Sequence, residues 1–296
     1  MNEMPKIAGV TVLYQPSEEV ILNILSYLNQ IDLLYIIDNS EEINMEIIGR
    51  IREYDRIRIL DNYGNIEIAA ALNKAARKAI EDDYDFLLTM DQDTALPDNM
   101  VVELLNKIEN YSKVGIIYPY HNVTLVGDVT KRHNLQKDVL TVMTCGNLLN
   151  LKAYKEIGGF EEKLFIDYVD HEFCLRLNRK GYRIIQDHSV SIMHRLGKRK
   201  IKYVLFKRFE PTNHIPIRLY YRTRNRLFVW KKYIRYYPLY VFNDIIHFCR
   251  EIISISLTEE KKLKKIKMIL LGIRDFILGR YGKLRLKYNS RQSVLK

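Results

Sequence analysis

Apolar and polar positions alternate in blocks along the first two thirds of the chain. Apolar runs that predict short buried strands occupy Ile7–Leu13, Leu33–Ile37, Arg56–Leu60 and Asp85–Met90. Helical patterns at Ser17–Leu28 and Ile66–Ile80 follow the first and third runs. Strands that alternate with helices predict an α/β fold with a mostly parallel central sheet, whose ligands bind at the carboxyl ends of the strands.

The same alternation continues to about His194, where we expect the compact α/β domain to close. The further elements are a helix at Asn99–Glu109, a strand at Val114–Tyr118, a loop or hairpin at His121–Asp138, a strand at Val139–Asn150, a short helix at Lys152–Ile157, a helix at Asp170–Lys180, and strands at Tyr182–Ile185 and Val190–Met193. Gly158-Gly159 ends the short helix, as glycine often does after a last helical turn.

Beyond this domain the pattern changes to helices with basic faces. Apolar residues between Leu263 and Ile277 recur every three or four positions, and five lysines crowd the start of the same segment. Two interpretations stay open: a helix that packs on the domain with a solvated basic face, or one that lies on a membrane surface. We expect a catalytic domain over residues 1–230 and a basic helical extension over 231–296.

Net charge also differs between the first two thirds and the last third of the chain. Residues 1–194 hold 20 lysines and arginines against 30 aspartates and glutamates, whereas residues 195–296 hold 27 against 6, for net charges of −10 and +21. The C-terminal third therefore favours an anionic partner, either a membrane surface or nucleic acid. No recognised nucleic-acid module accompanies this charge, so we expect no nucleic-acid partner.

The cysteines and the N-terminus indicate a cytoplasmic location. Three widely spaced cysteines, without any Cys-x-x-Cys, predict neither a disulfide framework nor a zinc site. The first residues lack the charged and then apolar pattern of a signal peptide, and no apolar run is long enough to span a membrane.

Two carboxylates, Asp91 and Asp93, follow the apolar run that ends at Met90. Such a close pair repels itself unless a cation lies between the charges. Oxygen ligands, few in number, suit Mg²⁺ or Mn²⁺ with phosphates and water completing the coordination. Taken alone, the pair is equally compatible with a solvated turn or helix cap.

An ordered set of motifs resembles family 2 glycosyltransferases over about residues 5–230. The motifs are Tyr14-Gln15-Pro16, Ile37-Asp38-Asn39-Ser40, Met90-Asp91-Gln92-Asp93, Gly158-Gly159-Phe160, Asp170-His171-Glu172-Phe173-Cys174-Leu175-Arg176 and Gly181-Tyr182. The segment 164–170 is most similar to the rhamnosyltransferase branch. The resemblance implies a GT-A fold and an inverting transfer of a sugar from a nucleotide diphosphate sugar.

For the donor, the resemblance implies that Tyr14, Asp38 and Asn65 lie at the nucleotide. Asp38 matches the position that holds a uracil or thymine base and its ribose, although a cap or an Asx-turn would explain an aspartate there as well. Glu67 departs from the family, which often has glycine at this position. A side chain there narrows or reorients the pocket and puts the exact donor in doubt.

For the metal, the resemblance implies that Asp91 and Asp93 form the Asp-x-Asp motif, with Asp93 as the direct ligand. His194 resembles a histidine that joins the metal in related enzymes, although a lone histidine after a strand is more often structural. An imidazole ligand would make Mn²⁺ slightly more natural than Mg²⁺.

For catalysis, the resemblance implies that Asp170 is the general base that takes the proton of the acceptor hydroxyl. The family usually has an acid before the base, whereas Val169 stands here. Glu172 keeps a second carboxylate nearby and remains an alternative base. Arg222 or Arg226 is expected to stabilise the diphosphate, with a solvated or membrane-facing basic patch as the alternative.

These expectations describe a metal-dependent inverting glycosyltransferase that moves a sugar from a nucleotide diphosphate donor to a glycan or lipid-linked acceptor in cell-surface polysaccharide synthesis. L-Rhamnose from dTDP-rhamnose is the leading donor, and another UDP- or dTDP-sugar is the alternative. A sugar nucleotidyltransferase is disfavoured because the first strand is not followed by a glycine-rich phosphate loop. We expect the protein to be peripheral on the inner face of the cell membrane.

Overall fold

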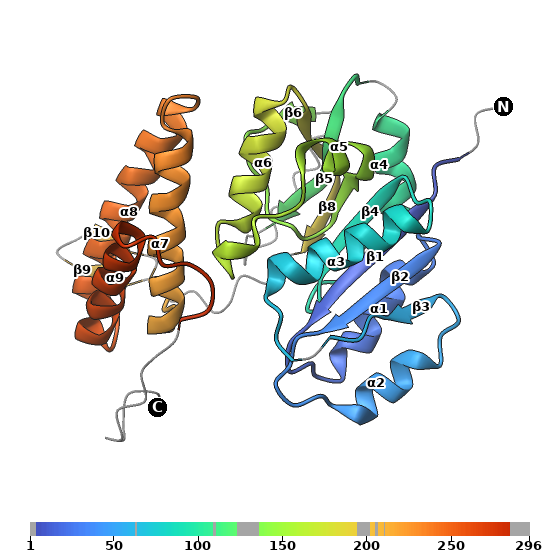
Figure 1. Ribbon diagram of the computed structural model, residues 1–296, viewed down its shortest axis with the longest axis horizontal. Coiled ribbons are helices and arrows are strands. Elements are labelled where there is room, and N and C mark those ends of the chain that lie inside the picture. The colour runs from blue at the N-terminus through green and yellow to red at the C-terminus, as the bar shows by residue number, and fades with distance from the viewer. Residues whose placement is uncertain are drawn as a thin grey trace.

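The structure is a computed structural model that describes residues 4–62, 64–108, 111–122, 136–193, 202–204, 207–209 and 211–284. Its elements are β1 (Ile7–Leu13), α1 (Glu19–Leu28), β2 (Leu33–Asp38), α2 (Met45–Arg52), β3 (Ile57–Ile59), α3 (Ile68–Glu81), β4 (Phe86–Asp91), α4 (Met100–Ile108), β5 (Val114–Asn122), β6 (Gln136–Asp138), β7 (Asn147–Asn150), α5 (Leu151–Ile157), a 3₁₀ turn η1 (Glu162–Leu164), α6 (Val169–Arg179), β8 (Arg183–Met193), β9 (Lys202–Val204), β10 (Lys207–Phe209), α7 (Pro216–Tyr233), α8 (Pro238–Thr258) and α9 (Lys262–Ile277). Figure 1 shows the helices α7 to α9 grouped beside the sheet.

The central sheet has the strand order β3-β2-β1-β4-β7-β5-β8-β6. Its first four strands are parallel, β7 is antiparallel to both of its neighbours, and β5 and β8 are again parallel. Side chains of α1, α2 and α4 share one apolar core, and those of α3, α5 and α6 share another, so helices cover both faces of the sheet (Figure 1). The predicted α/β class with a mostly parallel sheet is confirmed.

Three elements differ from the sequence-based expectation. Helix α2 was not predicted, because it has only about two turns and buries only three isoleucines, at positions 47, 48 and 51. The strand expected over Val139–Asn150 is confined to β7, because Gly146 adopts a φ of +74° just before it. The two last strands expected before His194 form one strand, β8.

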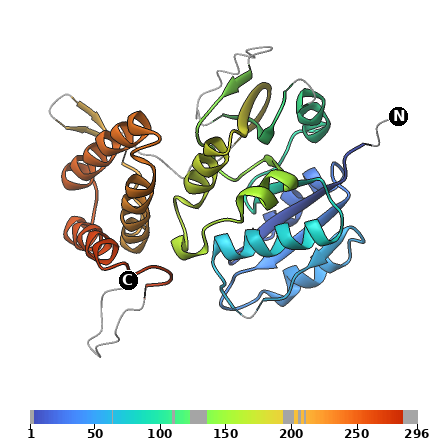
Figure 2. The same cartoon turned by 45° about the horizontal axis from the view of Figure 1, so that its top comes forward.

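The chain beyond the sheet folds as helices, with a short β9–β10 hairpin that the sequence pattern did not predict. Gly272 allows α9 to lie directly on α7, since a Cβ there would stand 2.6 Å from the Tyr220 carbonyl oxygen. Figure 2 shows α7, α8 and α9 as one helical group beside the sheet domain. The domain division expected after residue 230 falls within α7 and stays a prediction.

Candidate functional site

The carboxyl ends of three parallel strands bring the expected donor residues to one edge of the sheet. Leu13 at the end of β1 is in register with Asp38 at the end of β2, and Val12 is in register with Asp91 at the end of β4. Tyr14 follows β1 directly. The carboxyl ends of parallel strands meet at the same edge of a sheet, where ligands of such sheets bind. Tyr14, Asp38 and Asp91 therefore lie at one edge.

Gln92, the middle residue of the Asp-x-Asp motif, holds two of these strand ends together. Its side-chain oxygen accepts from the Tyr14 N–H at 2.8 Å, and its side-chain nitrogen donates to the Tyr14 carbonyl at 3.0 Å. The loop after β4 is thereby fixed to the loop after β1. The sequence analysis assigned Gln92 no role, because a residue between two acids carries no signal of its partner 78 positions away.

The carboxylate of Asp38 is buried, and only one of its two oxygens accepts a hydrogen bond from the described residues. Its Oδ1 accepts from the Ser40 N–H at 2.8 Å, which is the Asx-turn expected as the alternative. Its Oδ2 is also buried and has no hydrogen-bond partner among the described residues. A buried acceptor without a partner costs about 1–3 kcal/mol, so a ligand N–H or hydroxyl at this atom would recover that cost.

Glu41 joins two other expected donor residues. Bonds to its own backbone, together with those of Tyr14 and Asn65, hold the pKa of Glu41 below its ordinary value although desolvation acts in the other direction. Glu41 therefore interacts with Tyr14 and Asn65, two residues expected at the nucleotide. Sequence reasoning missed Glu41, because a solvent-exposed acid after a strand is common.

Glu67 adopts a backbone conformation that favours glycine. Its φ of 78° and ψ of 155° lie in a region that side chains rarely enter, at a cost of about 1–3 kcal/mol. Burial raises the pKa of its carboxyl, while the charges of Arg224 and Lys283 act in the opposite direction. The family's frequent glycine at this position has a physical basis in this backbone, and the present chain bears a glutamate there at the cost of strain.

The donor set fits a divalent cation that the substrate helps to hold. Asp91 ends β4 and Asp93 is exposed two residues later. Within the described ranges, no three histidine, cysteine or acidic side chains form a metal-binding group. Two carboxylates with phosphate oxygens and water are a normal set for Mg²⁺ or Mn²⁺. His194 lies outside the described residues.

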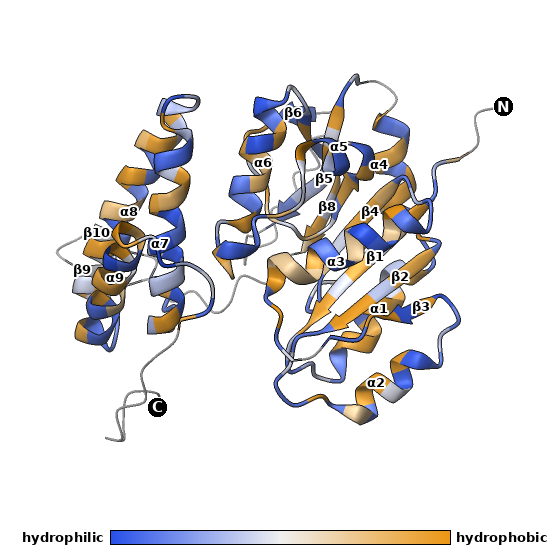
Figure 3. Cartoon of the chain, in the orientation of Figure 1, coloured by the Kyte–Doolittle hydropathy of each residue, from blue (hydrophilic) through white to orange (hydrophobic). Residues whose placement is uncertain are grey.

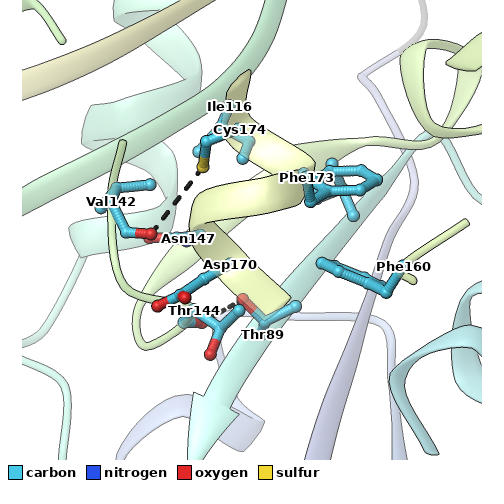
Figure 4. A pocket seen from close by; sticks show the side chains of 10 residues that line it. Thr89, Ile116, Val142, Thr144, Asn147, Phe160, Asp170, Phe173 and Cys174 are labelled. Carbon is cyan, nitrogen blue, oxygen red and sulfur yellow. Dashed lines mark hydrogen bonds between the residues drawn. The ribbon is translucent and has the colours of Figure 1, made fainter. Parts of the chain in front are cut away.

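Asp170 lies in the first turn of α6, close to β4. It lines a small cavity together with Thr89 of β4 and Thr144, beside which its side chain lies in Figure 4. The His171 N–H donates to Asp170 Oδ1 at 2.8 Å. The cavity has a volume of about 10 Å³, which is room for no more than about one water. This cavity is therefore too small to hold a sugar.

Glu172, the alternative base, is occupied elsewhere. Its side chain is 0% exposed and forms ion pairs of 2.7 Å with both Arg176 and Lys232, while the Tyr233 hydroxyl donates to it at 2.9 Å. Burial would raise its pKa, but the bonds and charges of Arg176 and Lys232 hold the pKa below its ordinary value. Glu172 thus anchors α6 to α7, and the geometry favours Asp170 as the base.

The loop before Asp170 is strained and is held by α7. Phe165, Asp167 and Tyr168 all have positive φ values, between 62° and 67°. The side-chain amide of Asn225 donates to the carbonyls of Leu164, Ile166 and Asp167. Strain of this kind persists only where the surroundings over-determine it. The Arg-Asn part of the family motif therefore supports the loop that carries the candidate base, a role that sequence reasoning missed.

Three arginines, Arg218, Arg222 and Arg226, form a stripe at i, i+4 and i+8 along α7. Arg226 is buried and bound to Glu251 at 2.7 Å and to Asp244 at 3.3 Å, so the expectation that it meets the diphosphate is wrong. Arg222 lies 3.5 Å from Glu251 and 3.2 Å from His214. These contacts direct Arg222 toward α8 and the start of α7, so the structure gives no support to its expected contact with the diphosphate.

Arg218 is the arginine of the stripe that belongs to the crevice. It is ion-paired with Asp167 at 3.1 Å. Burial would lower its pKa, but Asp167, and then Asp170 and Asp91, hold the pKa above its ordinary value. Its side chain remains 45% exposed. Its helical spacing from Arg222 was a signal that could have found it.

Comparison with known proteins identifies the family of the chain. The model of the family described as "Glycosyl transferase family 2" matches residues 11–176. The chain is 25% identical over 235 residues to dTDP-rhamnosyl transferase RfbF of Shigella flexneri. This aligned region covers 74% of the present chain and 77% of the relative.

Solved structures resemble the fold at low sequence identity. The crystal structure of GalNAc-T7 with UDP, GalNAc and Mn²⁺ has a TM-score of 0.56 at 12% identity over 64% of this chain, and the match spans only 43% of that chain. S. aureus TarS 1-349 has a TM-score of 0.50 at 12% identity over 92% of this chain and 72% of that chain. Since the family model covers more than half of the sequence, the chain belongs to glycosyltransferase family 2 and is a glycosyltransferase with a GT-A-like fold.

Proposed function

We propose that the protein is an inverting glycosyltransferase that takes its sugar from a UDP- or dTDP-sugar, with dTDP-rhamnose as the leading donor. One observation supports this most: Asp38 ends β2 and Asp91 ends β4, on either side of β1, and Asp170 of α6 lines a small cavity together with Thr89 of β4. The free buried oxygen of Asp38 suits the N–H of a uracil or thymine ring. The relative named as a dTDP-rhamnosyl transferase favours rhamnose as the sugar.

In this proposal each side chain has one task. Asp91 and Asp93 would hold a Mn²⁺ or Mg²⁺ ion, which when bound would offset the charge that grows on the leaving diphosphate. Arg218, rather than Arg222, adds a positive charge beside Asp167, in the loop that leads to Asp170. Asp170 accepts the proton of the acceptor hydroxyl as that oxygen attacks the anomeric carbon opposite the departing diphosphate.

Nucleotide release tests the assignment directly. We expect turnover of one donor among dTDP-rhamnose, UDP-glucose, UDP-galactose and GDP-mannose, in the presence of Mn²⁺ or Mg²⁺ and a lipid-diphosphate acceptor mixture. Asp93→Ala should lower this rate by about 100-fold or more, because the leaving-group charge loses its stabilisation. Asp98→Asn, at an exposed acid five residues later, is the matched control. Wild-type protein that shows no metal-dependent binding of any of these nucleotides would contradict the proposal.

We also propose that the acceptor is a lipid-linked glycan and that the helical group rests on the cytoplasmic membrane surface. Figure 3 shows hydrophobic and hydrophilic segments alternating along α8 and α9. Leu263, Leu270 and Ile277 are exposed at seven-residue intervals on α9, and Lys267 and Arg274 are exposed between them. Apolar side chains interspersed with cations suit an anionic bilayer surface better than nucleic acid.

The structure changes which residues of α8 and α9 contribute to the proposed membrane-binding surface. Lys265, one of the lysines counted on its basic flank, is buried in an ion pair of 2.5 Å with Glu259, so it does not contribute surface charge. The exposed apolar stripe of α8 includes Leu239, Phe242, Ile253 and Leu257. None of the helices in the described part of the chain has the length and hydropathy of a membrane span.

A vesicle-binding assay tests the surface proposal. We expect the protein to co-sediment with phosphatidylglycerol vesicles and much less with phosphatidylcholine vesicles. Replacing Leu263, Leu270 and Ile277 together by serine should weaken binding by about tenfold or more, since burying one such side chain in an apolar phase contributes about 1.5–3 kcal/mol. Leu22→Ser changes an equally exposed leucine on α1 and should have no effect. Unchanged binding by the triple variant would refute this face as the contact.

A further inference from the structure

Helix α8 reaches the turn that carries Asp170 through two polar side chains. The Tyr240 hydroxyl and His171 Nδ1 form a hydrogen bond of 2.6 Å, and the His171 N–H in turn donates to Asp170 Oδ1 at 2.8 Å. The Tyr168 hydroxyl donates to both carboxylate oxygens of Asp244, at 3.0 and 2.9 Å. Residues on both sides of Asp170 are therefore bound to one helix, by partners 69 and 76 positions later in the chain.

Asp244 is the centre of this contact. Trp230 Nε1 donates to its Oδ2 at 2.7 Å, and Arg226 Nε lies 3.3 Å from the same oxygen. Arg226 Nε also donates to the Tyr168 hydroxyl. The Asp244 side chain is only 15% exposed, and hydrogen bonds to a charged group with little water around it are strong and directional. Asp244 thus ties Tyr168 to α7 as well as to α8.

The turn needs this support because its backbone is strained. Tyr168 has a φ of 65° and a ψ of 2° at the start of α6, a left-handed conformation that a bulky side chain rarely adopts. Such strain persists only where the surroundings over-determine it. Asn225 binds the carbonyls of residues 164, 166 and 167, which all precede Tyr168. The contacts from α8 hold the next part of the segment, from Tyr168 to His171.

We propose that Tyr240 and Asp244 are positioning residues for the transfer reaction, because they fix the turn that places the Asp170 carboxylate at the acceptor hydroxyl. This inference rests on the proposed function, since it takes Asp170 to be the base. A catalytic group that is misplaced by about 1 Å costs about 10²-fold in rate. Helix α8 is thereby a part of the active site, while its Leu239 and Phe242 remain exposed for the surface contact proposed above.

Steady-state kinetics of the full chain, with the donor identified by nucleotide release and the lipid-diphosphate acceptor mixture, test the positioning. Tyr240→Phe removes only a hydroxyl and should lower kcat by about fivefold, the size of one lost hydrogen bond. Asp244→Asn should lower kcat by about twentyfold, because it removes a charged acceptor. The Kd of UDP or dTDP, measured by calorimetry with Mn²⁺, should stay within about twofold, since both residues bind the turn around Asp170. Tyr236→Phe, at an exposed tyrosine just before α8, is the matched control.

The same substitutions in the Asp170→Asn background separate positioning from a general loss of folded protein. If Tyr240 and Asp244 act through Asp170, they should change the kcat of Asp170→Asn by less than about twofold. An equal loss in both backgrounds, or single variants with the wild-type kcat, would overturn the positioning proposal and leave the proposed function standing. A kcat of Asp170→Asn above about one tenth of wild type would overturn the assignment of the base, and the positioning proposal with it.

Discussion

Asp170→Asn is expected to lower kcat by about 10²–10⁴-fold, the usual contribution of a positioned general base. The substitution keeps the size of the side chain and retains an oxygen that accepts from the His171 N–H. Asparagine cannot take the acceptor proton at neutral pH, so the loss should appear in the chemical step. Steady-state kinetics with the donor and acceptor identified by nucleotide release would measure it, and calorimetry should show an unchanged nucleotide Kd.

The separation of kcat from donor affinity distinguishes a base from a residue that only supports the loop. Asp98→Asn should keep the full rate, because Asp98 is exposed and lies in the turn before α4. A kcat for Asp170→Asn above about one tenth of wild type would remove Asp170 from the role of base. A parallel loss of nucleotide binding would instead indicate damage to the crevice.

Glu172→Gln is expected to lower the free energy of unfolding by about 3 kcal/mol, near the lower end for a broken buried ion pair because Lys232 is partly solvated. The substitution leaves Arg176 and Lys232 without their shared carboxylate, at the contact between α6 and α7. Urea unfolding followed by circular dichroism would measure the change. Under conditions where both variants are fully folded, Glu172→Gln should lower kcat far less than Asp170→Asn does.

The dependence of this loss on pH gives a second measurement. Because the pKa of Glu172 is lowered in the folded protein from its ordinary value of 4.5, its stabilising contribution is present above pH 4.5 and disappears as the pH falls through the folded value. The difference between wild type and Glu172→Gln should therefore narrow in acid. Glu103→Gln, at an exposed position on α4, should unfold within about 0.5 kcal/mol of wild type. A similarly small change for Glu172→Gln would contradict the anchoring role.

The choice between Asp170 and Glu172 shows what sequence proximity leaves open. Both acids stand in the first turn of α6, two positions apart, and each fits a helix N-terminus. Residues two apart on a helix do not share a face, so one meets the crevice and the other meets a different neighbour. Which is which depends on α7, which supplies Lys232 and Tyr233 from 60 and 61 positions away.

The arginines of α7 are a second case in which the sequence pattern predicts a charge but packing decides which residue supplies it. The sequence predicted a cation for the diphosphate in the segment 220–226, but the residue whose charge reaches Asp91 and Asp170 is Arg218. All three arginines of the stripe are alike in sequence. They differ because α8 places Asp244 and Glu251 against the later positions, whereas the loop at Asp167 faces the first.

The sequence by itself determined the α/β class, the order of most strands and helices, the family, and the strand ends at Asp38 and Asp91, because these follow from local periodicity and from motifs a few residues long. Tertiary structure alone decided the anchoring of Glu172, the support of the strained loop by Asn225 and the ion pair of Arg218 with Asp167. Each of these depends on contacts between residues about 50 to 60 positions apart. Such contacts are fixed by how the helices pack against the sheet, and no local pattern encodes them.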